Sequence, residues 1–76
     1  MPKPYMALRF LIKAMGWDQE QVGKIIGKSG RYVSPRMNAR ISWELEDCFA
    51  ILKAAGKPDS DILKYFPRDP WETVDF

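Results

Sequence analysis

The fold of this chain is decided by one stretch of twenty residues, which reads Gln19-Glu20-Gln21-Val22-Gly23-Lys24-Ile25-Ile26-Gly27-Lys28-Ser29-Gly30-Arg31-Tyr32-Val33-Ser34-Pro35-Arg36-Met37-Asn38. Val22 and Ile26 are four residues apart, so they share one face of a helix, and Val33 and Met37 repeat that spacing. The stretch therefore predicts two short helices. Their apolar faces are too small to be stable alone, so other parts of the chain must cover them.

A tight turn is expected between these two helices. Gly27 can adopt a positive φ, and the Ser29 hydroxyl can accept a hydrogen bond from a free backbone N–H of the second helix. A helix, a glycine corner and a second, capped helix are typical of a helix-turn-helix, which offers its second helix to the major groove of DNA.

The charge distribution favours the same interpretation. Residues 1–40 carry eight Lys or Arg against two acids, a balance of +6, whereas residues 41–76 carry four against eight, a balance of −4. The net charge of +2 therefore hides a basic half and an acidic half. Five cations and no acid lie between positions 24 and 40, a pattern expected where a polyanion binds: Lys24, Lys28, Arg31, Arg36 and Arg40.

The rest of the chain also shows helical periodicity. We expect helices over residues 5–15, 18–26, 30–37 and 43–55, and a short fifth helix that begins near residue 58 and ends at Pro67. Two apolar stripes support the first and fourth of these: Leu8, Leu11, Ile12 and Met15, and Leu45, Cys48, Phe49 and Leu52. The expected helix stops are Gly16 and Gly56, and the expected starts are Pro4, Asp18 and Ser42.

One position is less regular. Pro35 lies too deep in the third helix for a first-turn residue, so we expect either a bend there or a separate short turn that begins at Ser34.

No strand alternation and no internal repeat is present, which predicts an all-α domain over residues 1–67 and a tail over 68–76. The tail is apolar at Trp71, Val74 and Phe76, so it is expected to fold back or to contact a second subunit.

The composition excludes several classes of function. One cysteine and no histidine allow neither an internal disulfide nor a four-ligand zinc site, and Cys48 lies in an apolar stripe without a histidine to activate it. We therefore expect no enzyme, no metal, no cofactor and no small-molecule substrate. No apolar run approaches the roughly 20 residues that span a bilayer, so a soluble, cytoplasmic protein without a membrane partner is expected.

The sequence resembles a known family. Residues 18–29, Val33, Met37-Asn38 and the segment over residues 43–52 look like the Cro/CI-type helix-turn-helix regulators of the XRE family, in their small phage-type variant. The resemblance covers roughly residues 6–67. It implies a five-helix, lambda-repressor-like domain that binds double-stranded DNA in a sequence-specific manner, usually as a homodimer, and acts as a bacterial or prophage transcriptional regulator, repressor-like in type.

The resemblance also implies which residues face DNA. The positions that face the groove would be Gly30, Arg31, Ser34 and Pro35, and those near the DNA backbone include Gln19, Asn38 and Arg40. Arg31 is the candidate for base readout because a guanidinium can bond guanine O6 and N7 together, although a phosphate contact is the alternative. We interpret the remaining cations as phosphate-positioning groups, namely Lys24, Lys28, Arg36 and again Arg40. We expect Tyr32 to pack on the sugar-phosphate backbone of DNA, and closing the domain's core is the alternative.

Four positions depart from the family pattern. Gly23 replaces a usual Ala, which we expect to be mild, and Ala39 replaces a common Gly, which is tolerable. Gly30 and Pro35 stand where polar readers are common.

Two alternatives stay open. One is a protein-interaction module that keeps the helical fold but does not bind DNA. The other is a KH-like RNA-binding domain, because residues 25–30 resemble the Gly-x-x-Gly loop that clamps a nucleic-acid backbone. That interpretation requires strands after Ile41.

Overall fold

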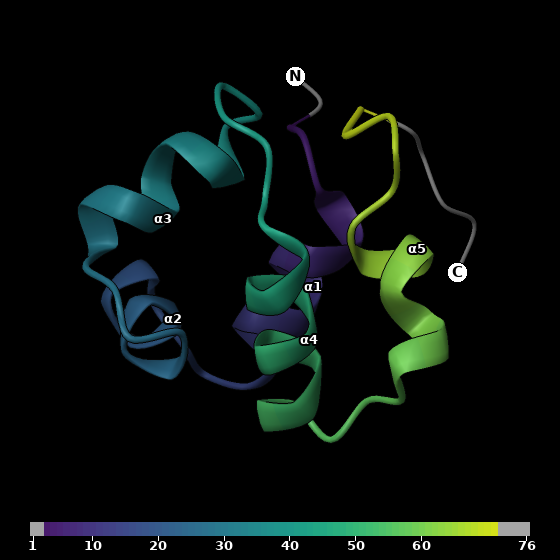
Figure 1. Ribbon diagram of the computed structural model, residues 1–76, viewed down its shortest axis with the longest axis horizontal. Coiled ribbons are helices and arrows are strands. Elements are labelled where there is room, and N and C mark those ends of the chain that lie inside the picture. The colour runs from purple at the N-terminus through teal and green to yellow at the C-terminus, as the bar shows by residue number, and fades with distance from the viewer. Residues whose placement is uncertain (1–2, 72–76) are drawn as a thin grey trace.

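The computed structural model describes residues 3–71 and contains five α-helices in that range (Figure 1). They are α1 (Met6–Ala14), α2 (Gln19–Ile25), α3 (Gly30–Met37), α4 (Leu45–Ala54) and α5 (Ile62–Tyr65), with a short 3-10 helix, η1 (Asp59–Asp61), before the last. Residues 3–71 include no strand, which confirms the all-α prediction and leaves the KH interpretation without the sheet that it requires.

The core lies where α1 and α4 meet the other helices, with α2 and α3 on one side and α5 on the other (Figure 1). The largest side chains that are fully buried are Leu8, Val22, Val33, Ile51 and Leu52. Leu8 and Leu52 come from the two predicted stripes. The stripes are wrong at Met15 and Leu45, which are 41% and 62% exposed.

The ends of the helices agree with the prediction better than their starts do. Gly16, Gly27 and Gly56 each come directly after a C-cap residue, as expected. The Asp18 cap is also confirmed, because Asp18 Oδ1 accepts a 2.8 Å hydrogen bond from the backbone N–H of Gln21. Ser29 occupies the N-cap of α3, but its side chain accepts no hydrogen bond there.

Two predicted starts are wrong. Helix α4 begins at Leu45 with Glu44 as its N-cap, so Ser42 and Trp43 stay outside it. Trp43 instead packs edge-on against Phe66, with 5.5 Å between ring centroids, and this contact holds the chain extended before the helix. Pro4 does not open α1 either, because Tyr5 is the N-cap, in a left-handed conformation with φ of 56°.

The segment before α1 is hydrogen-bonded to the segment after Pro67. The backbone N–H of Tyr5 donates a 2.7 Å hydrogen bond to the carbonyl oxygen of Pro70, so the segment after Pro67 folds back as far as that residue. Trp71 is 55% exposed, and the expectations for Val74 and Phe76 fall outside the described residues. Within residues 3–71, no helix has the length and apolar character that crossing a membrane requires.

Candidate nucleic-acid interface

Helices α2 and α3 form a closely packed pair, and Gly23 is the reason they can approach so closely. The N–H of Lys28 donates a 2.7 Å hydrogen bond to the Gly23 carbonyl, so the turn folds directly over α2. A Cβ at position 23 would lie 2.7 Å from the Lys28 carbonyl oxygen and 2.9 Å from the Ser29 carbonyl carbon. The expectation that Gly23 is a mild departure is therefore wrong, because backbone atoms occupy the space that an alanine would need.

Hydrophobic burial fixes this pair on the core. Val22 and Val33 are fully buried, Met37 is 3% exposed and Ile26 packs partly buried against the same cluster. The spacing that predicted the two helices therefore also identified their inner faces. The residues on the other faces of α3 are left to face solvent or neighbouring elements.

Gly30, predicted to face the DNA groove, is buried. A Cβ added there would meet the carboxylate of Glu20, so this side of Gly30 faces α2. Gly30 offers no side chain and little surface to a ligand. We leave it out of the interface and regard it as a packing position.

Helix α3 continues through Pro35 to Met37, so the alternative of a separate turn beginning at Ser34 is wrong. Pro35 has no N–H, which leaves the carbonyl of Arg31 without its usual helical donor. The Pro35 carbonyl itself accepts a 2.9 Å hydrogen bond from the N–H of Arg40, which closes the end of the helix. Ser34 and Pro35 are both half-buried.

Tyr32 and Arg36 are engaged within the chain. The Tyr32 hydroxyl donates a 2.5 Å hydrogen bond to Oδ2 of Asp47, which is buried in the first turn of α4. The Arg36 guanidinium lies 3.4 Å from the centroid of the Tyr32 ring, and its Nη1 donates a 2.9 Å hydrogen bond to the Tyr32 carbonyl. Arg36 Nε is buried without a hydrogen-bond partner among the described residues. The contacts favour the alternative for Tyr32, packing within the domain, over the expected place on the DNA backbone, and they engage Arg36 within the chain as well.

The hydrogen bond to Asp47 has an electrostatic consequence. It is the largest cause that raises the pKa of Tyr32 above its ordinary value of 10.0, with desolvation second. Ionising the phenol would remove the proton that the carboxylate accepts and bring two negative charges together. The contact therefore favours the neutral phenol and attaches Tyr32 to α4.

Arg9 is a structural residue that the sequence analysis did not identify. Its Nη2 donates to the Met37 carbonyl at 2.7 Å and to Asn38 Oδ1 at 3.3 Å. Its Nε donates to the Pro4 carbonyl at 2.7 Å. Arg9 thus links the N-terminal arm, α1 and the end of α3, and it orients Asn38, one of the residues predicted near the DNA backbone.

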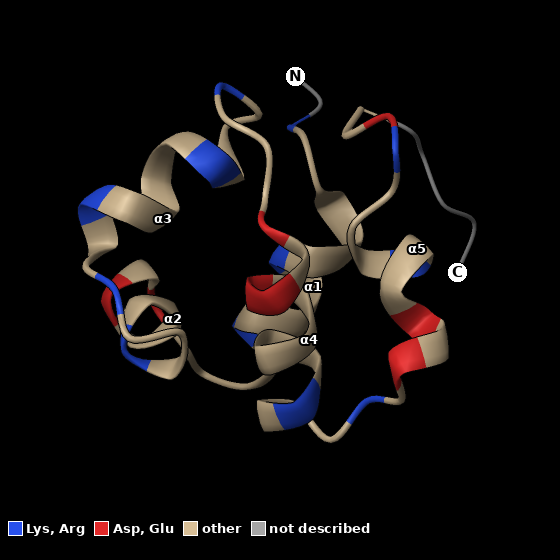
Figure 2. Ribbon diagram, viewed as in Figure 1, with Lys and Arg blue, Asp and Glu red and all other residues tan. Residues whose placement is uncertain are grey.

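The remaining predicted residues are exposed. Four cations surround α3 and its preceding turn with side chains open to solvent: Lys24, Lys28, Arg31 and Arg40. Gln19, at the first position of α2, is exposed as well. Figure 2 shows the basic positions along α2, the turn and α3. These five side chains are available to a ligand that approaches from this side.

Acidic residues border the same helix, which the charge pattern along the sequence did not predict. Glu44, Glu46 and Asp47, at the start of α4, line a hollow together with Lys28 and Tyr32. The basic and acidic halves of the sequence therefore do not form two separate faces. A polyanion must approach α3 away from this acidic edge, because phosphates placed against it would be repelled.

The cysteine side chain lies in the core. Cys48 is buried, as expected, and burial is the main cause that raises the pKa of its thiol to about 12, which keeps it protonated and unreactive. Among residues 3–71, no group of three or more His, Cys, Asp or Glu side chains is placed to hold a metal ion.

Comparisons of the chain with protein-family models, with curated proteins and with solved structures found no match.

Proposed function

We propose that this chain binds double-stranded DNA, with α2 and α3 acting as a helix-turn-helix and α3 entering the major groove. The observation that carries the proposal is the set of four exposed cations, Lys24, Lys28, Arg31 and Arg40, on and next to a helix pair fixed to the core. Phosphate contacts of this kind supply affinity and register, and base contacts supply specificity.

Arg31 has the role of base reader in this proposal. It is exposed at the second position of α3, and its side chain is long enough to reach a guanine edge when the helix lies in the groove. Lys24, Lys28 and Arg40 position phosphates, and Gln19 contributes a neutral contact at the start of α2. The resemblance to Cro/CI-type regulators supports a cytoplasmic, repressor-like regulator of bacterial or prophage origin that binds its operator as a homodimer.

The proposal is tested by selecting bound duplexes from a random pool and measuring affinities by fluorescence anisotropy. Replacing Arg31 by Ala should reduce discrimination against a mismatched site by about 1–3 kcal/mol, the range for one bidentate base contact. Lys28→Ala should weaken selected and random duplexes alike. Lys53→Ala, an exposed cation at the end of α4, is the matched control and should change neither. A pool without enrichment, together with no binding of random duplex, would refute the proposal.

The second candidate is a protein-interaction module without DNA binding. It is favoured by one specific observation, namely that Leu45 and Leu63 are 62% and 60% exposed. Arg31→Ala distinguishes the two candidates, because α3 binds the ligand in the DNA-binding protein but has no binding role in the interaction module. Unchanged partner binding by that variant, in the absence of any duplex binding, would favour the interaction module.

A further inference from the structure

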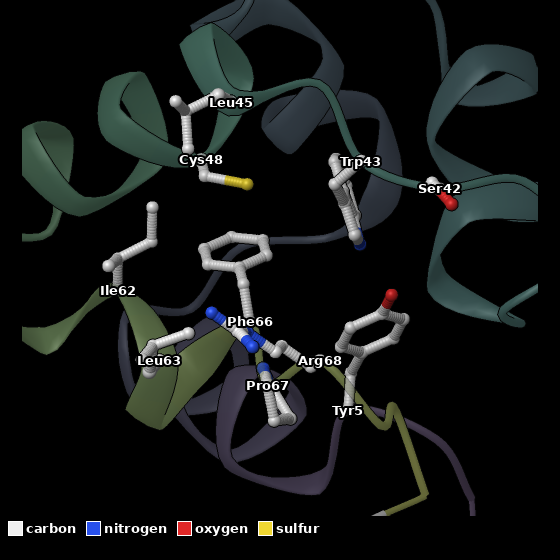
Figure 3. Close-up of a pocket in the computed structure, with 10 residues that line it drawn as sticks. All are labelled: Tyr5, Ser42, Trp43, Leu45, Cys48, Ile62, Leu63, Phe66, Pro67 and Arg68. Atoms are coloured by element: carbon white, nitrogen blue, oxygen red, sulfur yellow. The ribbon is translucent and has the colours of Figure 1, made fainter.

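Helices α4 and α5 form a small apolar groove with the segments next to them. Its volume is about 250 Å³. Figure 3 shows Leu45 and Cys48 on the α4 side and Ile62 and Leu63 on the α5 side, with the Phe66 ring between them. Leu45 and Leu63 are 62% and 60% exposed. Exposed apolar side chains grouped at a concave site mark a contact surface.

One cation faces this groove. Arg68 is the one charged side chain among the described residues that line it, and it is exposed. In Figure 3, the Arg68 side chain extends below the Phe66 ring toward Leu63. The acids Glu44 and Glu46 line the hollow on the α3 side instead. The groove is therefore apolar with one positive side chain, which favours a ligand that is apolar and negatively charged.

The backbone around Arg68 is held in place, but its guanidinium is not engaged. The N–H of Tyr5 donates a 2.7 Å hydrogen bond to the Pro70 carbonyl, which fixes the segment that carries Arg68. The adjacent acid, Asp69, accepts a 3.0 Å hydrogen bond from the N–H of Trp71. Among residues 3–71, the Arg68 guanidinium has no hydrogen-bond partner. Its N–H donors are therefore available to a carboxylate.

A second donor beside the groove is also unpaired. Trp43 lines the groove, and its Nε1–H is buried without a hydrogen-bond partner among the described residues. Figure 3 shows the nitrogen of Trp43 on the side of the ring that faces Tyr5. Buried donors are nearly always paired, and an unpaired one destabilises the folded state. An acceptor oxygen on a bound ligand would remove that penalty.

The size and the walls of the groove favour a single aromatic ring. A cavity of about 150 Å³ lined by Leu, Ile and Phe side chains is large enough to bind benzene. A groove of about 250 Å³ therefore accommodates one ring and one carboxylate. Trp43 and Phe66 already form an edge-to-face pair, with 5.5 Å between ring centroids, and a third ring can pack against them in a similar way. An aliphatic acid would gain no such contact.

We infer that the groove between α4 and α5 is a binding site for a small aromatic carboxylate, with the ring between Leu63 and Phe66 and the carboxylate on Arg68. The inference goes beyond the proposed function and does not depend on it, because none of the four cations assigned to DNA lines this groove.

Nuclear magnetic resonance of the isotope-labelled full chain, without DNA, tests the site with benzoate as the probe. The indole N–H signal of Trp43 is assigned by comparison with Trp43→Phe. It should shift on addition of benzoate and saturate with a dissociation constant of about 1 mM or below. Acetate has the charge without the ring and should leave the signal in place. Benzyl alcohol has the ring without the charge and should bind at least about tenfold more weakly.

Two pairs of variants locate the contact. Arg68→Gln should raise the benzoate dissociation constant at least about tenfold, whereas Lys64→Gln removes an exposed cation outside the groove and should not change it. Leu63→Glu places a negative charge where the ligand binds, so it should abolish the shift. Met15→Glu changes an apolar residue that is 41% exposed and does not line the groove, so it is the matched control. Circular dichroism checks that each variant is folded.

Three results would overturn the inference. The first is a Trp43 signal that stays unshifted at about ten times the expected dissociation constant. The second is equal weakening by Arg68→Gln and Lys64→Gln. The third is a signal that changes on dilution of the protein and not on addition of benzoate, which would assign the groove to a second copy of the chain. Since no DNA is present, these outcomes are independent of whether α3 binds a duplex.

Discussion

The Tyr32 hydroxyl and the Asp47 carboxylate, fifteen residues apart in the sequence, form a 2.5 Å hydrogen bond that joins α3 to α4. Asp47 is 8% exposed and is the one buried charged side chain of the described core. The cationic helix that we propose to enter DNA is therefore held by a polar contact in addition to its buried Val33 and Met37.

Removing this contact should weaken the fold. Tyr32→Phe leaves the Asp47 carboxylate without its donor, and an unsatisfied buried acceptor destabilises the folded state. We expect a lower urea midpoint with an unchanged m-value, measured by circular dichroism. Asp47→Asn keeps an oxygen that can accept the same hydrogen bond, so it should cost less than Tyr32→Phe. A Tyr32→Phe midpoint equal to that of the wild type would show that the bond contributes nothing.

Alkaline pH should destabilise the protein. The pKa of Cys48 is raised from 9.0 to about 12, mainly by burial, and those of Tyr5 and Tyr32 are raised above 10.0. The folded state thus holds protons that the unfolded chain loses, so the stabilisation is complete below pH 9 and is lost as the pH rises through the folded-state values. Urea denaturation should show stability falling from about pH 9 upward. In Cys48→Val, the fall should begin about one pH unit later, because the tyrosines are then the first groups to titrate. An identical pH profile for the two proteins would contradict this assignment.

Ala39 should be improved by glycine. It has φ of 60° directly after the C-cap of α3, and the Ala39 and Arg40 N–H groups donate back to the Arg36 and Pro35 carbonyls. An L-residue in this conformation destabilises the folded state by about 1–2 kcal/mol, and glycine removes that cost. Glycine also makes the unfolded chain more flexible, which offsets about 0.4–1 kcal/mol of the gain. Ala39→Gly should therefore raise the free energy of unfolding by roughly 0.5–1 kcal/mol.

Position 27 provides the reverse experiment. Gly27 has φ of 71° in the equivalent place after α2, so Gly27→Ala should lower the free energy of unfolding by a similar amount, about 0.5–1 kcal/mol. Both variants are measured by urea denaturation. The assignment fails if the two substitutions change stability in the same direction.

Two glycines near the α2–α3 contact should respond differently to alanine. Gly23→Ala places a Cβ against backbone atoms of Lys28 and Ser29, which cannot move without disturbing the turn, so a loss of about 1–3 kcal/mol is expected. Gly30→Ala meets only the end of the flexible, exposed Glu20 side chain and gains helix propensity. Its stability should be close to that of the wild type or above it. Thermal denaturation compares the two, and equal losses would show that the turn is not packed as described.

Local signals predicted most of the fold. Helix α2 begins and ends within a residue of its predicted bounds, because Asp18 caps it and Gly27 provides the left-handed turn after it. The start of α4 was predicted two residues too early, since Ser42 is a good cap locally but Trp43 packs on the distant Phe66. A cap preference is weaker than the burial of a large aromatic side chain.

The candidate site was less predictable for the same reason. Whether Arg31 or Arg36 faces solvent depends on contacts with residues distant in the sequence, and Arg36 is placed by Tyr32, which Asp47 holds in turn. Arg9 reaches 28 residues along the chain to the Met37 carbonyl. Periodicity identifies which face of a helix is apolar, but it cannot identify which polar side chains of the opposite face are used internally.

The salt dependence of duplex binding tests the central proposal most directly. If the four exposed cations around α3 each neutralise one phosphate, log K should fall against log[salt] with a slope of about −3.6, at roughly −0.9 per phosphate. Lys28→Ala should make that slope shallower by about 0.9, whereas Lys53→Ala should leave it unchanged. A slope near zero for the wild type, or equal slopes for wild type and Lys28→Ala, would contradict DNA binding through this surface.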